Sequence, residues 1–304
     1  MSDRYKLQHI PGIGFGTYKL KTQKEINYSL EYALRAGYRH IDTAQLYKNE
    51  HLISHFLEYQ LPELELGCTR LDIWITTKVP YFTMLECNEE KIRKSIQQSC
   101  NYFGGYVDLY LIHASNPNDM MTWRILQEYQ RMGYIRYIGL SNYNLERLDN
   151  FIQRLELSEF TNPGYQEHGI YMNQIEYNPF QNRADLVARC KELGIKITAY
   201  GSLYKKNELI ESLASRLGKR DIAIDSNSDT SGDNDSGIGD GNDYTAEQIL
   251  LAWCASKNIT VIPTSRNLQH IEANYKSMMI KLEPNDIAGL DNLHENYTRY
   301  AKHL

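Results

Sequence analysis

An acid and a phenol lie five residues apart in the segment YRHIDTAQLYKNE, which spans Tyr38–Glu50. The segment begins as a short β-prone run and then presents Asp42 and, within a polar stretch, Tyr47. Two later β-prone runs, LDIWITTKV and YVDLYLIHA, carry Lys78 and His113 near their ends. Four functional groups at similar places of successive strands predict one shared reaction site.

These four side chains could together deliver a proton to a carbonyl oxygen. A phenol has an ordinary pKa of about 10 and is a poor acid at neutral pH. An ammonium group beside Tyr47 would lower the pKa of the phenol, and a carboxylate at Asp42 would keep Lys78 charged and in place. We therefore expect Tyr47 to act as a proton donor, while a neutral His113 orients the carbonyl oxygen. No side chain supplies a hydride, so reduction of the carbonyl carbon would require a nicotinamide cofactor.

Each of the four residues also has an ordinary structural explanation when it is taken alone. Asp42 could cap the segment that follows it, and Tyr47 is one of 24 tyrosines. A single lysine such as Lys78 is usually solvated, and a single histidine such as His113 is more often a hydrogen-bonded interior residue. The catalytic interpretation therefore depends on their convergence.

A repeated pattern of helix, turn residue and strand would position these groups. In EYALRAGYRHIDTA, QEYQRMGYIRYIGLSN and ARCKELGIKITAYG, a helical stretch is followed by Gly and a short apolar strand, and AWCASKNITVIPTS has Asn258 in place of Gly. Gly or Asn is typical of the left-handed residue that ends a helix. The strands are expected at Arg39–Asp42, Tyr137–Leu140, Lys196–Tyr200 and Thr260–Pro263.

The number of such units predicts the fold. Further strands are expected in LDIWITTKV, YVDLYLIHA, YMNQIEYNP and, in a shorter form, GIGFGTY. Apolar strands that alternate with helices are typical of a parallel sheet covered on both faces. About eight strand–helix units predict a parallel, eight-stranded (β/α)8 TIM barrel, which we expect residues 1–304 to form as a single domain. The alternative is a doubly wound open sheet, but the first strand is not followed by a GxGxxG turn, to which GIGFG is only partly similar.

The residues just beyond the expected strands are rich in functional groups. The carboxyl ends of the strands share one face of a parallel barrel, so these residues would meet there. They are Asp42, Tyr47, Lys78, His113, Ser141, Asn142, Gln174, Glu176, Tyr200, Thr264 and Ser265. We therefore expect the reaction site at this face.

Composition excludes several other classes of protein. A net charge of −5 offers no basic surface for nucleic acid or anionic membranes, and no apolar run is long enough to span a bilayer. The N-terminus lacks the apolar stretch of a secretory signal. Five scattered cysteines without a CxxC pair are typical of reduced thiols in a cytoplasmic protein, and no group of residues has the spacing of metal ligands. We expect a monomer, although a protein partner is left open.

One acidic segment interrupts the repeating pattern. Residues 225–243 consist mainly of Asp, Ser, Gly and Asn, with six Asp, no basic residue and Ile238 as the only apolar side chain. Such a segment buries too little apolar surface to order itself, so we predict a disordered insertion. A calcium loop of the EF-hand type is not expected, because counting from Asp233 places Ile238 and Tyr244 where Gly and Glu are needed.

The chain as a whole resembles the aldo-keto reductase family. The resemblance is carried by GFGTYKL, GYRHIDTAQLYKNE, DIWITTKV, VDLYLIHA, IGLSNYN, NQIEYNPF, ITAYGSL and VIPTSRNLQHIEAN, which follow in the family's order. Each motif alone is moderately specific, and together they cover nearly the whole chain. The resemblance implies a (β/α)8 barrel, in agreement with the number of strands.

The resemblance also implies a role for individual residues. Tyr47 would be the general acid, with Asp42, Lys78 and His113 completing a tetrad, and Tyr18 would line the substrate pocket together with Tyr47 and His113. The residues implied for the nicotinamide are Ser141, Asn142, Gln174 and Tyr200. Ser202 and Leu203 would lie by the pyrophosphate, and Ser265, His270 and Asn274 by the adenosine.

Two departures from the family concern the cofactor. Where the family usually has IPKS, this chain has IPTS, so that Thr264 replaces a lysine that normally pairs with the 2′-phosphate of NADP. His270 replaces an arginine, and Arg266 could compensate for the lost charge. Charge-assisted contacts of roughly 1.5–3 kcal/mol each are affected. NADP(H) is the expected cofactor, and use of NAD(H) stays open.

The sequence therefore predicts an NADP-dependent oxidoreductase that reduces aldehydes or ketones, with hydride from the nicotinamide and the proton from Tyr47. A short connection after His113 and an early end at NYTRYAKHL predict an open substrate site with few discriminating contacts. The alternative is a regulatory subunit that binds a nicotinamide cofactor and senses its redox state with little turnover. A relative that binds the cofactor poorly is a third hypothesis, because of Thr264 and His270.

Overall fold

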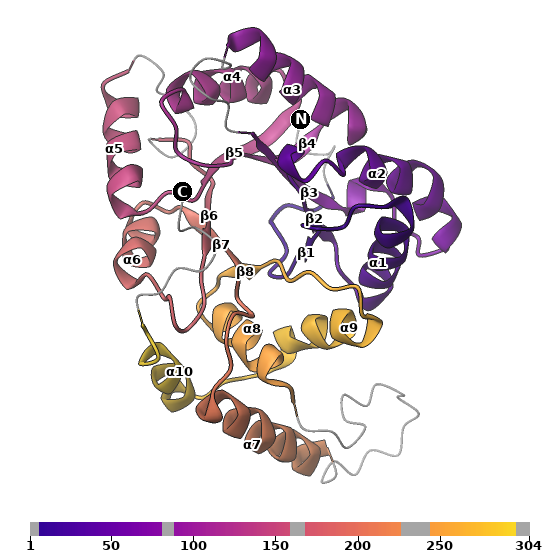
Figure 1. The fold of residues 1–304 in the computed structure, drawn as a ribbon, viewed down its shortest axis with the longest axis vertical. Helices are drawn as coiled ribbons and strands as arrows, with labels where there is room; N and C mark the ends of the chain where they lie inside the picture. The colour runs from indigo at the N-terminus through magenta and orange to yellow at the C-terminus, as the bar shows by residue number, and fades with distance from the viewer. Residues whose placement is uncertain (1–5, 81–87, 159–167, 226–243, 296–304) are drawn as a thin grey trace.

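Eight parallel strands form one sheet in which each strand is hydrogen-bonded to its neighbours in sequence order (Figure 1). The computed structural model describes residues 6–80, 88–158, 168–225 and 244–295. The strands are β1 (Phe15–Gly16), β2 (His40–Asp42), β3 (Trp74–Val79), β4 (Val107–Ile112), β5 (Ile135–Ser141), β6 (Met172–Glu176), β7 (Lys196–Tyr200) and β8 (Thr260–Val261).

The first and last strands meet, and this closes the sheet. Ile13 forms a parallel bridge with Val261, the Gly14 amide donates to the Val261 carbonyl at 2.8 Å, and the Val261 amide donates to the Gly12 carbonyl at 3.0 Å. The predicted (β/α)8 barrel is therefore confirmed. The open doubly wound alternative is wrong, because its edge strands would stay apart.

Helices surround the sheet on its outer side (Figure 1). They are α1 (Gln23–Ala36), α2 (Glu50–His55), α3 (Glu89–Tyr102), α4 (Asp119–Arg131), α5 (Leu145–Glu156), α6 (Ala184–Glu192), α7 (Glu208–Asp225), α8 (Ala246–Ser256), α9 (Leu268–Lys276) and α10 (Pro284–Asp291). Short helical turns are η2 (Gln45–Tyr47), η3 (Phe56–Gln60), η4 (Leu61–Leu64), η5 (Arg70–Asp72) and η6 (Ser277–Met279).

The turn residues expected between helix and strand have the predicted backbone conformation. Gly37, Gly133, Gly194 and Asn258 have φ values of 109°, 80°, 67° and 58°, all in the left-handed region. Such a residue ends a helix by letting the chain reverse toward the sheet. The recurrent Gly or Asn therefore marks where four of the strands, β2, β5, β7 and β8, begin.

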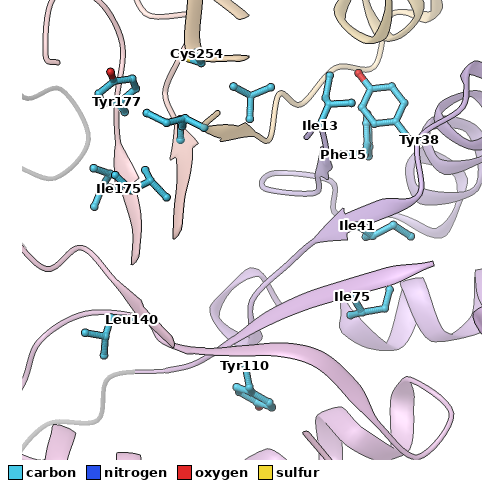
Figure 2. Packing of buried hydrophobic residues seen from close by; sticks show 14 of the residues in the cluster. Ile13, Phe15, Tyr38, Ile41, Ile75, Tyr110, Leu140, Ile175, Tyr177 and Cys254 are labelled. Atoms are coloured by element: carbon cyan, nitrogen blue, oxygen red, sulfur yellow. The ribbon is translucent and has the colours of Figure 1, made fainter. Parts of the chain in front are cut away.

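Side chains of the strands alternate between two environments. Ile41, Ile75 and Tyr110 point outward and belong to the large apolar core between sheet and helices (Figure 2). The neighbouring residues point inward, where Trp74, Leu109, Leu111 and Met172 form a smaller cluster within the sheet. Because side chains alternate with a period of two, Asp42 and Lys78 share the inner side of the barrel with His40 and Thr76.

The strand β5 approaches β6 so closely at Gly139 that no larger residue fits. A Cβ atom at Gly139 would lie 2.5 Å from the Met172 carbonyl oxygen and 2.9 Å from Leu111 Cδ2. Overpacking of this kind costs about 1–3 kcal/mol, so we expect Gly139→Ala to lower the free energy of unfolding by that amount in urea denaturation. Gly12→Ala is the control, because its Cβ would meet nothing within 4 Å. Equal stability of the two variants would contradict this account.

Two further expectations from the sequence concern the acidic insertion and membrane-spanning helices. The acidic insertion predicted at residues 225–243 lies outside the described residues, apart from Asp225 at the end of α7. Within the described residues, no helix combines the length and apolar character needed to cross a membrane.

Candidate active site

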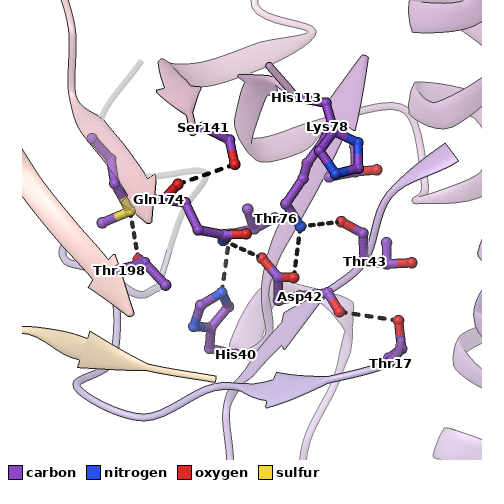
Figure 3. A network of polar contacts seen from close by, with 12 residues as sticks. Thr17, His40, Asp42, Thr43, Thr76, Lys78, His113, Ser141, Gln174 and Thr198 are labelled. Atoms are coloured by element: carbon purple, nitrogen blue, oxygen red, sulfur yellow. Dashed lines mark hydrogen bonds and ion pairs between the residues drawn. The ribbon is translucent and has the colours of Figure 1, made fainter. Parts of the chain in front are cut away.

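A buried ion pair between Asp42 and Lys78 lies inside the barrel at the carboxyl end of the strands. Asp42 ends β2 and Lys78 lies on β3, and each side chain is almost completely buried. The Lys78 ammonium donates to Asp42 Oδ1 at 2.7 Å and to the Thr43 carbonyl at 2.8 Å. The Gln174 amide donates to the other carboxylate oxygen at 2.7 Å (Figure 3). Lys78 and Gln174, which lie 36 and 132 positions after Asp42 in the sequence, thus both bind its carboxylate.

Burial and charge act in opposite directions on this pair. Burial lowers the pKa of Lys78, which the Asp42 carboxylate opposes. Burial likewise raises the pKa of Asp42, which Lys78 and the Gln174 hydrogen bond oppose. A buried ion pair is tolerated when its geometry is good and further hydrogen bonds satisfy both charges. Both conditions hold here, so we describe Asp42 and Lys78 as an ion pair.

Tyr47 stands beside this pair. It ends η2, the short turn after β2, and its ring is half-buried. The ring centroid lies 5.2 Å from Lys78 Nζ, and 5.1 Å and 6.1 Å from the ring centroids of Tyr18 and His113. Phenol, amine, carboxylate and imidazole, spread over residues 42–113, therefore converge as the sequence predicted.

The pKa of the Tyr47 phenol is raised above its ordinary value, opposite to the direction expected from sequence. Burial is the main cause, and the negative charge of Asp42 is the second. From sequence we expected the Lys78 ammonium to lower this pKa and Asp42 only to hold that ammonium, but Asp42 also offsets its charge, and the buried surroundings disfavour a phenolate. Tyr47 consequently holds its proton, which is the state that an acid needs before it reacts.

His113 is neutral in this site. It follows β4, and its ring lies close to Lys78 in Figure 3. Burial, followed by the charge of Lys78, lowers the pKa of the imidazole to about 3. A neutral imidazole has one N–H to donate, so His113 can hydrogen-bond an oxygen near Tyr47 without adding a charge.

Hydroxyl and amide side chains from β5, β6 and β7 form the next layer. Asn142 has a left-handed backbone with φ of 62°. Its amide donates to the His113 carbonyl at 2.9 Å and to Ser141 Oγ at 3.1 Å, while Tyr200 donates its hydroxyl to Asn142 Oδ1 at 2.6 Å. The Ser141 hydroxyl donates to the backbone carbonyl of Gln174 at 3.1 Å. The four residues expected at the nicotinamide therefore form one connected group, and through Gln174 it reaches Asp42.

The residues expected at the far end of the cofactor lie on two later loops. Ser202 is buried and Leu203 half-buried just after β7. Beyond β8, Thr264 and His270 are exposed, while Asn274 is buried on α9.

Arg266 is tied to the first loop of the barrel. Its Nε lies 2.9 Å from Glu25 Oε1, and its Nη2 donates to the Lys19 carbonyl at 2.5 Å. Ser265 Oγ accepts from the Asn267 amide at 3.0 Å and so shapes the turn before α9. Arg266 therefore joins the loop after β8 to the first loop and helix of the barrel, whereas the Ser265 contact stays within its own turn.

Some residues of the site were not identified from sequence. The Thr43 carbonyl holds Lys78, and the buried side chains of Asn49 and Glu50 lie just after Tyr47. The one feature of the sequence that could have pointed to these residues is that the segment Tyr38–Glu50 stays polar to its end. Among the described residues, no three His, Cys, Asp or Glu side chains are grouped so that they could hold a metal ion.

The chain is similar to known oxidoreductases over nearly its full length. The model of the aldo/keto reductase family matches residues 12–295. Methylglyoxal reductase DkgB from Escherichia coli O157:H7 is 30% identical over 290 residues, which cover 93% of each protein.

Solved structures agree with this family match. The aldose reductase of Schistosoma japonicum superimposes with a TM-score of 0.73 at 25% identity and covers 96% of this chain and 91% of that one. The aldose reductase of Giardia lamblia has a TM-score of 0.75 and covers 96% of this chain and 94% of that one, and at 23% identity it supports the fold alone.

Proposed function

The chain belongs to the aldo/keto reductase family, and from this premise we propose that it reduces aldehydes or ketones to alcohols with a reduced nicotinamide cofactor. One observation carries the proposal. A phenol that holds its proton, Tyr47, lies beside a buried Lys78–Asp42 pair and a neutral imidazole, His113, at the carboxyl end of the barrel.

Tyr47 donates the proton in this mechanism. As the carbonyl oxygen gains negative charge, His113 hydrogen-bonds it and the phenol transfers its proton to it. The tyrosine is then a phenolate, and its new charge lies beside the Lys78 ammonium. Lys78 therefore acts mainly on the state formed during the reaction, which differs from its small effect on the resting phenol. Asp42 keeps the ammonium charged and in place.

The residues around Asn142 fit the amide of a nicotinamide. That amide needs both a donor and an acceptor, and the Ser141 hydroxyl and the Asn142 and Gln174 amides include both kinds of group. The Ser141 and Asn142 donors would exchange a hydrogen bond within the protein for one to the cofactor. The half-buried ring of Tyr200 offers a flat face for the nicotinamide ring. When bound, the reduced nicotinamide supplies the hydride to the carbonyl carbon. The side-chain nitrogen of Gln174 donates to Asp42. The side-chain oxygen of Gln174 can therefore accept from a cofactor amide while the bond to Asp42 is kept.

NADP(H) is our preferred cofactor, with NAD(H) as the second possibility. Thr264 and His270 supply no permanent positive charge at the adenosine end, so Arg266 is the cation there that could pair with a 2′-phosphate. Its ion pair with Glu25 competes with that role. Ser202, Leu203, Ser265 and Asn274 complete the set that we assign to the pyrophosphate and the adenosine.

Removal of Arg266 tests this assignment. We expect Arg266→Ala to raise the KM for NADPH about ten- to hundredfold, the equivalent of one lost charge-assisted contact, and to leave the KM for NADH nearly unchanged. The measurement is steady-state kinetics with both cofactors. Arg189→Ala is the control, because Arg189 on the remote helix α6 forms a similar partly exposed ion pair with Asp149 on α5. Unchanged values for both cofactors would show that Arg266 only connects two loops.

Small, reactive aldehydes are the substrates that we propose first. The relative from Escherichia coli O157:H7 is a methylglyoxal reductase, and in this chain Tyr18, 54% exposed, stands beside Tyr47 at the open side of the site.

The test is to mix the purified chain with NADPH or NADH and a panel of carbonyl compounds that includes methylglyoxal and a reactive aromatic aldehyde. We expect the absorbance of the reduced cofactor to decline with at least one of them. If cofactor binding is seen by fluorescence while no compound is reduced with either cofactor, the proposal fails and the regulatory alternative gains support.

A further inference from the structure

A buried polar cluster lies behind Tyr47, on the outer side of the sheet, and none of its side chains belongs to the tetrad. We call it the Glu50 cluster, and its members are Gln45, Glu50, Thr77, Ser99 and Tyr110. The Thr77 hydroxyl donates to Glu50 Oε1 at 2.6 Å, and the Ser99 hydroxyl lies 3.0 Å and 3.1 Å from the two carboxylate oxygens. Gln45 Nε2 donates to Ser99 Oγ at 2.7 Å, and the Tyr110 hydroxyl donates to the same atom at 2.9 Å.

The hydrogen bonds of the Glu50 cluster all run toward the Glu50 carboxyl, which suits an ionised carboxylate. Ser99 Oγ has one hydrogen, and with Gln45 and Tyr110 donating to it, this hydrogen is left for Glu50. Thr77 also donates to Glu50. The two side chains that contact the carboxyl therefore both donate to it. Ser99 Oγ already accepts from Gln45 and Tyr110, so a neutral carboxyl or an amide that turns a hydrogen toward Ser99 would lose that hydrogen bond, whereas the Thr77 oxygen could still accept one.

Two members of the cluster hold the turn that carries Tyr47. Gln45 lies two residues before Tyr47 and Glu50 three residues after it, and both are anchored to Ser99 on α3. Asn49 holds the other side of the same turn, because its amide donates to the Thr17 and Leu20 carbonyls at 2.9 Å and 3.1 Å. The position of the phenol thus depends on buried hydrogen bonds made by its neighbours in sequence.

We propose that Glu50 is a positioning residue for the reaction: through Ser99 and Gln45 it fixes the η2 turn so that the Tyr47 hydroxyl is aimed into the site. The inference depends on the proposed function, because it assigns Glu50 to the proton transfer made by Tyr47. Glu50 contacts neither substrate nor cofactor in this proposal and acts only through the turn.

The ionisation of Glu50 gives the proposal a pH dependence. Burial raises the pKa of the Glu50 carboxyl to about 7, and the hydrogen bonds from Thr77 and Ser99 and the charge of Lys78 oppose this shift. The titratable groups that face it are Lys78 on β3, Tyr110 on β4 and Cys100 on α3. As the pH falls through about 7, Glu50 gains a proton and loses its charge. Its hydrogen bond from Ser99, whose oxygen already accepts from two donors, is then weakened, so the turn loosens and kcat should decrease.

The variant Glu50→Gln tests the role of the carboxylate, because it keeps the size and removes the charge. Its NH2 group would meet Ser99, whose oxygen already accepts from Gln45 and Tyr110. We expect a decrease in kcat on the order of ten- to hundredfold, the effect of a small misplacement of a reacting group. The KM for the carbonyl substrate should change little, and the limb of the pH profile near 7 should disappear.

Two conservative variants give an order of effects that a merely structural role would not produce. Ser99→Ala cuts the connection between Glu50 and Gln45, whereas Thr77→Val removes one donor and leaves that connection intact. We therefore expect kcat to fall more in Ser99→Ala than in Thr77→Val, even if Glu50→Gln does not fold. Equal or reversed effects would contradict the proposal.

Asp108→Asn is the matched control. Asp108 is a buried carboxylate that accepts from Arg70 and from the Ile75 amide, but it lies at the opposite, amino end of β4. Its replacement should lower the melting temperature and leave kcat and the pH limb unchanged. Loss of the limb in Asp108→Asn would mean that general destabilisation, and not the turn, controls the pH profile.

A readout independent of turnover separates this inference from the proposed function. In protein labelled with 3-fluorotyrosine, the ¹⁹F resonance of Tyr47 is identified by its absence in Tyr47→Phe. We expect Glu50→Gln to shift that resonance, and the wild-type resonance to titrate near pH 7. An unshifted resonance overturns the inference, whereas a wild-type protein that reduces no carbonyl compound overturns only the proposed function.

Discussion

Tyr47→Phe is expected to abolish carbonyl reduction while the protein still folds and binds the cofactor. The substitution keeps the ring, with its contacts to Tyr18 and His113, and removes only the hydroxyl that donates the proton. Loss of a general acid lowers the rate about 10²- to 10⁴-fold, so kcat for the aldehyde found active with the wild type should fall by this factor. Fluorescence titration with NADPH should give a Kd close to that of the wild type.

The same change at the neighbouring ring is the control. Tyr18→Phe also removes one phenolic hydroxyl, but the side chain is exposed and has no proton to deliver in our mechanism. We expect a kcat within a few-fold of wild type and at most a changed KM. A Tyr47→Phe variant that retains most of its activity would exclude Tyr47 as the acid, whatever the geometry of the site.

Lys78→Met is expected to remove both activity and a large part of the stability. The ammonium would no longer stabilise the phenolate of Tyr47, and the almost fully buried Asp42 would lose its cationic partner. Removal of one member of a buried ion pair costs about 3–5 kcal/mol. Urea denaturation at neutral pH should show a decrease of this size in the free energy of unfolding.

The pH dependence of this loss follows from the carboxyl that stays behind. Asp42 already has a raised pKa because of burial, and without Lys78 the pKa would rise further. A group whose pKa is raised by folding stabilises the protein below its unfolded pKa, about 3.9 for Asp, and loses that contribution as the pH rises through the folded value. The deficit of Lys78→Met should therefore be largest at neutral pH and shrink in acid.

A double variant separates the two effects of Lys78. Asp42→Asn with Lys78→Met replaces the ion pair by neutral groups, and such replacements are often nearly neutral in stability. We expect most of the unfolding free energy to return and the activity to stay lost. Recovery of activity together with stability would mean that the lysine is needed only for folding, which would refute its role beside Tyr47.

The barrel and the convergence of its functional groups could be predicted because they depend on local patterns. The Gly or Asn before four of the strands and the alternation of helix and strand are repeated along the chain. Once eight parallel strands close, the positions of Asp42, Lys78 and His113 at the carboxyl ends bring them to one face. The contacts observed between Asp42, Lys78 and Tyr47 agree with that prediction.

The electrostatic state of the site was decided by the tertiary structure. The pKa of Tyr47 depends on how deeply the ring is buried and on the charge that remains after Asp42 and Lys78 pair, and neither can be read from spacing. The bond from Gln174 to Asp42, the pairing of Arg266 with Glu25 and the bonds of the Glu50 cluster join residues from 11 to 241 positions apart. Periodicity assigns a residue to a strand or a helix and to one of its faces, whereas the donor that meets a given acceptor is determined only when the elements pack.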